Sequence, residues 1–199
     1  MFKPPRLQVD YTTIKTMPVR SPQSLAFEAM WRALPREGNG VPKRSAFLPE
    51  RAAKLLPHIA LVEIHTDAPM TTKVRLIGNT LRMLSGFDVT GLDYLDMAVD
   101  RDYYAARTRA YVGHPCGNWS AAPIIYERGY QSVMEMTCLP LTDDTTGGHL
   151  ILALIYETGD ALPEHRMVGL PIELHAAIVN EFIDIGAGVP EFNDVPRKS

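Results

Sequence analysis

Alternating apolar and charged positions predict β-strands in the first half of the chain. In residues 71–78 (TTKVRLIG), Lys73 and Arg75 share one face, as strand geometry requires, and the opposite face carries Thr72, Val74 and Leu76. Residues 59–65 (IALVEIH) form a short run rich in β-branched side chains, which favours a second strand. The loop between the two runs is short, so we expect them to pair as an antiparallel hairpin.

Three more strand-like runs lie close together in the second half of the chain. Turns at Gly129 and at residues 143–148 separate them, so they predict a three-stranded antiparallel meander. The runs are WSAAPIIY (119–126), QSVMEMTCLPL (131–141) and HLILALIY (149–156).

A leading helix over residues 21–34 has a recognisable start and one apolar stripe. Ser21 is a favourable N-cap, and Pro22 suits the first helical position. Apolar side chains recur at i, i+3, i+4 and i+7, the spacing of a single helical face. This stripe consists of Phe27, Met30, Trp31 and Leu34.

Shorter helices are expected between the hairpin and the meander, and another near the C-terminus. A helical turn should end at Gly86, and residues 101–112 predict a longer helix before Gly113. Residues 172–185 are interpreted as a C-terminal helix that buries one side.

This order of elements predicts an α+β fold with a five-stranded antiparallel sheet and short helices on one face. The chain of 199 residues suits one domain with flanking helices rather than two domains. We divide it into an extended N-terminal arm (1–20), a domain that includes the leading helix (21–160) and a tail (161–199).

Several short motifs follow one another along the chain in a characteristic order and spacing. They are Trp31, then Pro42, Arg44, Phe47 and Pro49 of VPKRSAFLPE, LLPHIALVEI, Arg75 and Gly78 of KVRLIGNTL, Gly86, Thr90 and Gly91 of SGFDVTG, and CLPL at Cys138–Leu141. Together they resemble the PAS family and, more narrowly, a subfamily of short stand-alone bacterial PAS proteins. The similarity covers roughly residues 24–157, and Asn79 departs from it, because that subfamily more usually has Thr after the Gly. The resemblance implies a sensory or interaction module in signal transduction and no particular ligand.

Composition narrows the classes of function and the location. The net charge is −3 without a clustered basic face, so we expect no nucleic-acid or membrane partner. No run is apolar enough to span a bilayer, and the N-terminus lacks the apolar core of a secretory signal. Cys116 and Cys138 are too few for a disulfide framework. A cytoplasmic protein with reduced thiols is the resulting expectation.

Cofactor sites are not expected. The histidines lack metal-site spacing, so no metal is predicted. The resemblance implies that a flavin photoreceptor of this family would carry a reactive Cys in residues 79–99, which contain none. Haem would need an axial His, and His114, beyond the helix end at Gly113, is the single nearby candidate. We therefore predict no cofactor.

A small apolar ligand between the sheet and the short helices is one hypothesis, and a filled core is the other. Ser132, Met134, Met136 and Cys138 alternate onto one strand face, and methionines adapt to irregular cavities. The predicted lining is Met83, Leu84, Phe87, Tyr104, Trp119, Met134 and Met136.

Three functions stay open at this point. The first is a non-catalytic adaptor that forms a homodimer, or binds a signalling partner, through Phe27, Met30, Trp31 and Leu34; the same stripe could instead pack on the chain's own sheet. The second is an enzyme with a cleft built from Asp102, Tyr104, Arg107 and His114. The third is a ligand-free structural partner subunit.

Overall fold

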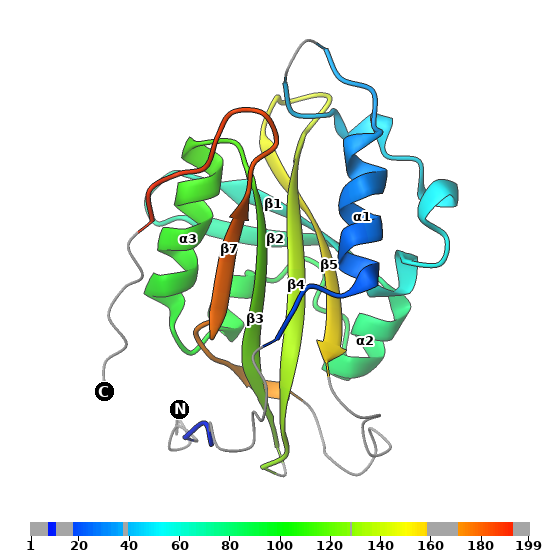
Figure 1. The fold of residues 1–199 in the computed structure, drawn as a ribbon. Coiled ribbons are helices and arrows are strands. Elements are labelled where there is room, and N and C mark those ends of the chain that lie inside the picture. The colour runs from blue at the N-terminus through cyan, green and yellow to red at the C-terminus, as the bar shows by residue number, and fades with distance from the viewer. Residues whose placement is uncertain (1–7, 11–17, 38–39, 128, 159–170, 193–199) are drawn as a thin grey trace.

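A seven-stranded antiparallel sheet forms the centre of the described structure (Figure 1). The computed structural model describes residues 8–10, 18–37, 40–127, 129–158 and 171–192. Within these residues the strand order is β2-β1-β5-β4-β3-β6, and β7 also pairs with β3. The strands are β1 (Ile59–His65), β2 (Thr71–Ile77), β3 (Gly117–Tyr126), β4 (Gln131–Thr142), β5 (His149–Thr158), β6 (Pro171–Leu174) and β7 (Val179–Ile183).

The helices connect or precede these strands, much as the sequence pattern predicts. The α-helices are α1 (Pro22–Arg32), α2 (Asn79–Ser85) and α3 (Arg101–Gly113). Short 3-10 segments are η2 (Arg44–Ala46), η3 (Pro49–Ala52), η4 (Leu56–His58) and η5 (Tyr94–Met97). The hairpin, the meander, the leading helix and the α+β class are thereby confirmed.

The ends of α1 and α2 follow from their local sequences. The Ser21 hydroxyl accepts a hydrogen bond from the Ser24 amide at 3.1 Å, and Pro22 occupies the first turn of α1. Helix α2 ends at Gly86, whose φ of 70° lies in the left-handed region. A side chain with a Cβ adopts this conformation rarely, so Gly is favoured at this helix end.

The central strands are apolar on both sides, and each side faces a different core. Along β1, Ile59 and Leu61 pack with α1, whereas Ala60, Val62 and Ile64 pack with α2 and α3. Strand β5 alternates in the same way. Successive strand residues point to opposite faces, so one strand contributes to both cores. Both faces are covered, unlike the one-sided arrangement that the sequence predicted.

Helix α1 covers the first face and lies against β4 and β5 (Figure 1). Phe27 and Trp31 have no exposed surface, and the Trp31 indole donates to the Pro140 carbonyl at 2.9 Å. Leu34 is also buried, and Met30 packs partly against the same core. Of the two alternatives for this stripe, the structure shows packing on the chain's own sheet, and the formation of a homodimer stays a prediction.

The predicted C-terminal helix over residues 172–185 is also wrong, because β6 and β7 form there instead. Both strands pair along the outer edge of β3, and between them the Ile178 amide donates to the Ala121 carbonyl at 2.9 Å. An open strand edge presents unpaired backbone groups, which these segments satisfy. The sheet consequently has more strands than the predicted five.

The N-terminal arm lies mostly outside the described residues. Within the described part, the Asp10 amide donates to the Gln131 side chain at 2.8 Å, and Gln131 donates back to the Asp10 carbonyl at 2.9 Å. These contacts join the segment 8–10 to the start of β4. Residues 159–170, which join the predicted domain to the predicted tail, and residues 193–199 also lie outside the described residues.

Candidate functional site

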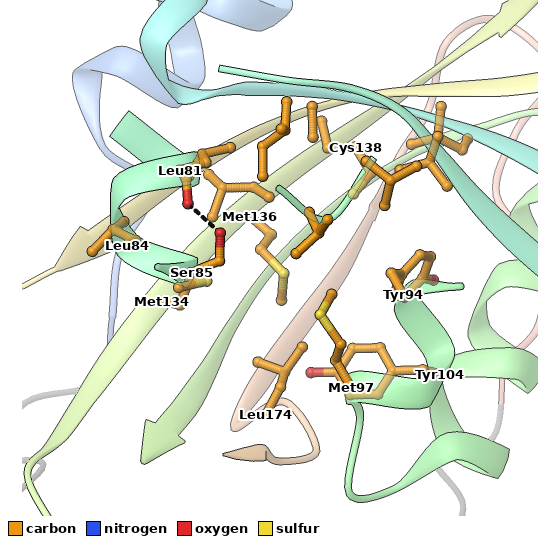
Figure 2. Close-up of a pocket in the computed structure, with 18 of the residues that line it drawn as sticks. Leu81, Leu84, Ser85, Tyr94, Met97, Tyr104, Met134, Met136, Cys138 and Leu174 are labelled. Carbon is orange, nitrogen blue, oxygen red and sulfur yellow. Dashed lines mark hydrogen bonds between the residues drawn. The ribbon is translucent and has the colours of Figure 1, made fainter. Parts of the chain in front are cut away.

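A cavity of about 450 Å³ lies between the second face of the sheet and the helices α2, η5 and α3. Pockets that hold small molecules typically measure about 300–1,000 Å³ and are mostly apolar with a few polar groups. Figure 2 shows Leu81 and Leu84 of α2 on one side of the cavity and Met97 and Tyr104 on the other. The size and the wall chemistry therefore fit a small molecule.

Strands β4 and β5 contribute most of the sheet wall of the cavity, with further residues from β1, β2 and β3. Met134, Met136 and Cys138 line it together, because alternate residues of a strand share one face. Ala153 on β5 and Ala60 on β1 also belong to this wall, and their small side chains leave space above the sheet. Short side chains on the neighbouring strands thus help to explain why the core is hollow here.

Five of the seven predicted lining residues meet at this cavity. They are Leu84, Phe87, Tyr104, Met134 and Met136. Whether these side chains bind a ligand stays a prediction.

The predictions for Met83 and Trp119 are wrong. Met83 is 70% exposed, because α2 turns Leu81 and Leu84 inward and Met83 falls outside that stripe. Trp119 is buried in the core beneath α1, where its indole donates to Glu135 at 2.7 Å. Its neighbour Ser120 points to the cavity side, and residues one position apart on a strand face opposite ways.

A buried arginine gives the cavity a polar end. Arg107 of α3 lines the cavity and is 2% exposed. Its Nη1 donates to the Ser120 hydroxyl at 2.9 Å, and its guanidinium lies over the Tyr104 ring, 4.5 Å from the centroid. Its Nε has no hydrogen-bond acceptor among the described residues. A cation is thus held in an otherwise apolar wall.

Tyrosine hydroxyls lie near this arginine. The Tyr94 hydroxyl and the Thr108 hydroxyl are 2.8 Å apart, and Thr108 and the Tyr111 hydroxyl are 3.2 Å apart. The Tyr104 hydroxyl donates to the His175 carbonyl at 2.7 Å. Burial raises the pKa of each of Tyr94, Tyr104 and Tyr111, although Arg107 partly opposes this rise in pKa. All three phenols therefore stay neutral and keep their protons at neutral pH.

The two cysteines are free and buried, and Cys138 is part of the cavity wall. Burial raises the pKa of the Cys138 thiol, although Arg107 partly opposes the rise. Burial, with a smaller effect of Asp184, raises the pKa of Cys116 to about 12. A thiol with a raised pKa is a weak nucleophile at neutral pH, because the thiolate is the reactive form.

The cavity opens between α2 and η5, where apolar side chains reach the surface. Phe87 and Met97 line the cavity and are 51% and 42% exposed. Asp93 anchors this rim, because its carboxylate accepts from the Leu95 amide at 3.1 Å and from Arg101 at 3.2 Å. It also accepts from the Thr72 amide at 3.0 Å, which ties η5 to β2.

The residues of the catalytic hypothesis do not form one cleft. Tyr104 and Arg107 line the cavity, but Asp102 is exposed on α3. His114 lies at the other end of α3, where its Nε2 is 2.7 Å from the Ala187 carbonyl oxygen. Asp102 does not join Tyr104 and Arg107, because residues two positions apart on a helix do not share a face.

A model of the PAS domain family matches residues 19–156, which is more than half of the chain. The chain belongs to the PAS family. The resemblance that the sequence motifs indicate is confirmed, together with the α+β PAS-like fold. PAS domains are sensory and signalling modules, so this coarse function holds for the chain as well.

Two further comparisons give one similar solved structure and no similar curated sequence. A solved structure of a fungal LOV domain photoreceptor is 18% identical to this chain, with a TM-score of 0.37 over 51% of this chain and 75% of that one. No curated protein sequence matches this chain.

The part of this PAS domain that the structure describes has neither a membrane-spanning helix nor a metal-binding cluster. No helix there is both long and apolar enough to cross a bilayer. Three or more His, Cys, Asp or Glu side chains do not gather there in a way that could hold a metal ion.

Sequence reasoning missed several polar members of this site. The sequence pattern does not predict Tyr94 and Tyr111 at the cavity, and it gives Arg107 only as a member of the catalytic cleft. A signal was present: Arg107 lies three residues after Tyr104 and four before Tyr111, so all three share a face of α3. An arginine within an aromatic stripe is a hint of burial.

Proposed function

We propose that this PAS domain is a non-catalytic sensory module that holds a small, largely apolar molecule in the cavity beneath α2 and α3. The supporting observation is the cavity of about 450 Å³ with aliphatic, aromatic and methionine walls. Cores normally fill such spaces, because an unfilled apolar volume loses packing contacts. A ligand would restore those contacts.

Occupancy of the cavity would be sensed at its rim. The rim carries the half-exposed Phe87 and Met97, and Gly86 and Gly91 on either side of Phe87 both have positive φ. Val74 holds the far end of this loop through backbone hydrogen bonds to Gly91 and Leu92. A ligand that packs against Phe87 would thus change the apolar surface that the rim presents to solvent.

The proposed output is a change in association with a second protein chain in the cytoplasm, either another copy or a signalling partner. The apolar stripe of α1 cannot provide this interface without unfolding, since Phe27 and Trp31 are fully buried. The rim is better placed, because its exposed apolar residues already face solvent. The separation of Asp102 and His114 from Tyr104 and Arg107 supports a module without catalysis.

Native mass spectrometry of freshly purified protein, with solvent extraction of any bound compound, tests this proposal. We expect a mass increment for the wild type and its loss in Ala153→Leu, which fills the cavity from β5. Ala29→Leu, on the exposed side of α1, is the matched control and should keep the increment. Light scattering should show that ligand removal changes the oligomer. A wild type that binds nothing from a panel of apolar compounds and never changes its oligomer would contradict the proposal.

A further inference from the structure

The guanidinium of Arg107 has no carboxylate partner among the described residues. It makes one hydrogen bond to them, through Nη1 to Ser120, and Nε has no acceptor. Asp96 also lines the cavity, but its carboxylate accepts from Arg101 at 2.6 Å at the surface. Buried charges in proteins are normally paired, because removing a cation from water without compensation is costly.

The surroundings of Arg107 compensate this charge only in part. Its guanidinium lies over the Tyr104 ring at 4.5 Å and near the Tyr103 ring at 5.9 Å, which are cation–π distances. Arginine cannot lose its proton at any physiological pH, so it cannot relieve its burial by becoming neutral. Several of its five N–H groups remain open to an acceptor from outside the chain.

From this arrangement we infer that the ligand is an amphiphilic anion: a monocarboxylate with an apolar body, whose carboxylate accepts hydrogen bonds from Arg107. The inference rests on the proposed function, because it needs an occupied cavity. The planar guanidinium matches a carboxylate in shape and charge, and such charge-assisted bonds are roughly twice as strong as neutral ones. The apolar body lies along Leu84, Met134 and Met136.

The neighbouring hydroxyls strengthen this assignment. Tyr94 and Tyr111 line the same cavity and keep their protons, so their hydroxyls can serve as donors. Carboxylates accept hydrogen bonds and donate none, and the positive charge of Arg107 favours them over ammonium groups. No carboxylate of the described chain is buried on this wall to attract a cation, since Asp96 reaches solvent.

Isothermal titration calorimetry with matched acid and alcohol pairs tests the inference. The aliphatic probes are decanoate, decanol and decylamine, and the aromatic probes are 4-phenylbutanoate and 4-phenylbutanol. The two pairs separate the shape of the apolar body from the charge of the head group. We expect at least one acid to bind about 10- to 100-fold more tightly than its alcohol, in line with hydrogen bonds to charged groups. Decylamine should bind more weakly than decanol.

Variants of Arg107 then locate the effect. Arg107→Met should weaken binding of the acid by about 10- to 100-fold and leave its alcohol within about two-fold. Arg107→Lys keeps the charge and should retain part of the preference. If Arg107→Met does not fold, the acid–alcohol ratio of the wild type and the Arg107→Lys ratio decide the question.

The outcomes separate this inference from the proposed function. Alcohols that bind as tightly as their acids, or an acid affinity that Arg107→Met leaves unchanged, would overturn the anion assignment while a ligand-binding cavity remained. If none of the probes binds, the proposed function fails and the inference fails with it.

Discussion

On one face of the sheet, α1 packs on a closed core around Trp31 and Trp119, and on the other, α2 and α3 cover a hollow one. A second pocket of about 330 Å³ lies on the first face, lined by residues such as Phe47, Leu61 and Leu152 and by no residue of α1. The α1 side contains the largest fully buried side chains, Trp31 and Trp119, and pairs both indole nitrogens with acceptors. The α3 side contains a cavity of about 450 Å³ and an arginine with an unpaired Nε. The same strands supply both faces, so the difference comes from the residues that alternate along them.

This contrast suggests that the α1 side stabilises the fold and the α3 side binds a ligand. The α1 side has the composition of a stabilising core with polar contacts inside the chain: Glu135 Oε1 accepts from the Ser21 amide at 2.9 Å, and the Ser24 and Thr137 hydroxyls are 2.6 Å apart. Glu135 Oε2 has no partner among the described residues. The α3 side is packed less tightly, because it contains the cavity. Regions specialised for binding are often less stable than the rest of a protein.

The largest expected effect is at the centre of the α1 side. Trp31→Ala should lower the free energy of unfolding by about 3–5 kcal/mol, because it leaves a cavity in a close-packed core. Leu25→Ala on the same helix is the control, since Leu25 is 52% exposed and should cost under about 0.5 kcal/mol. Urea denaturation measures both. Equal costs would mean that α1 does not pack on the sheet.

Matched truncations on β4 compare the two faces directly. Leu139 points to the α1 side and is fully buried, whereas Met136 borders the cavity. Leu139→Ala should cost about 2–5 kcal/mol. Met136→Ala should cost less, because atoms that face a void have few contacts to lose. Urea denaturation measures the free energy of unfolding of both variants. An equal loss for Met136→Ala and Leu139→Ala would contradict this difference between the two faces.

Enlarged side chains should have opposite effects on the two faces. A Cβ added at Gly117 would lie 3.1 Å from the Ile183 Cβ and 2.7 Å from a Leu139 methyl, so Gly117→Ala should destabilise the protein by about 1–3 kcal/mol. Ala153→Leu, which points into the cavity, should stabilise it by about 0.5–2 kcal/mol. Thermal and urea unfolding report both changes. Destabilisation by both variants would indicate that the cavity is smaller in solution.

The rim of the cavity should respond to pH through Asp93. Burial alone would raise the pKa of this carboxyl, but hydrogen bonds from Thr72, Leu95 and Arg101 outweigh burial and hold the pKa below its usual value. A lowered folded-state pKa adds stability that is present above the unfolded pKa and is lost as the pH falls through the folded pKa.

Asp93 is the N-cap of η5, so Asp93→Ala should lower the free energy of unfolding by about 1 kcal/mol at pH 7, the usual value of a lost N-cap. The gap between wild type and variant should narrow below about pH 4, the unfolded pKa of Asp. Urea denaturation across this pH range measures the gap. A gap that stays constant down to the lowest pH would show that the charge of Asp93 contributes nothing.

The strands were predictable because their signal is local. Alternation in residues 71–78 and the bounded apolar runs of the meander already specify period-two elements, and the structure confirms them. The end of the chain was not predictable in this way. A helical stripe would contain Leu174, Ile178 and Phe182. The segment instead forms strands that pair with the open edge of β3. Long-range backbone pairing outweighed the local pattern there.

The cavity could be predicted only in part. Alternation placed Met134, Met136 and Cys138 on one face, but a pattern of apolar residues does not reveal whether the space above them is filled. Leu139 and Met136 have similar hydropathy, yet one packs tightly and the other borders the void. The burial of Arg107 depends on how α3 sits on Ser120, which no short sequence window contains.

Methionine methyl NMR during a titration with decanoate tests the central claim most directly. That claim is that the α3 side of the sheet holds a ligand and the α1 side does not. Met134 and Met136 line the cavity, whereas Met30 packs against the α1 core, so their methyl groups report on the two faces separately. We predict saturable shifts at Met134 and Met136 with Met30 unchanged. Unmoved Met134 and Met136 signals, or an equal shift at Met30, would contradict the account.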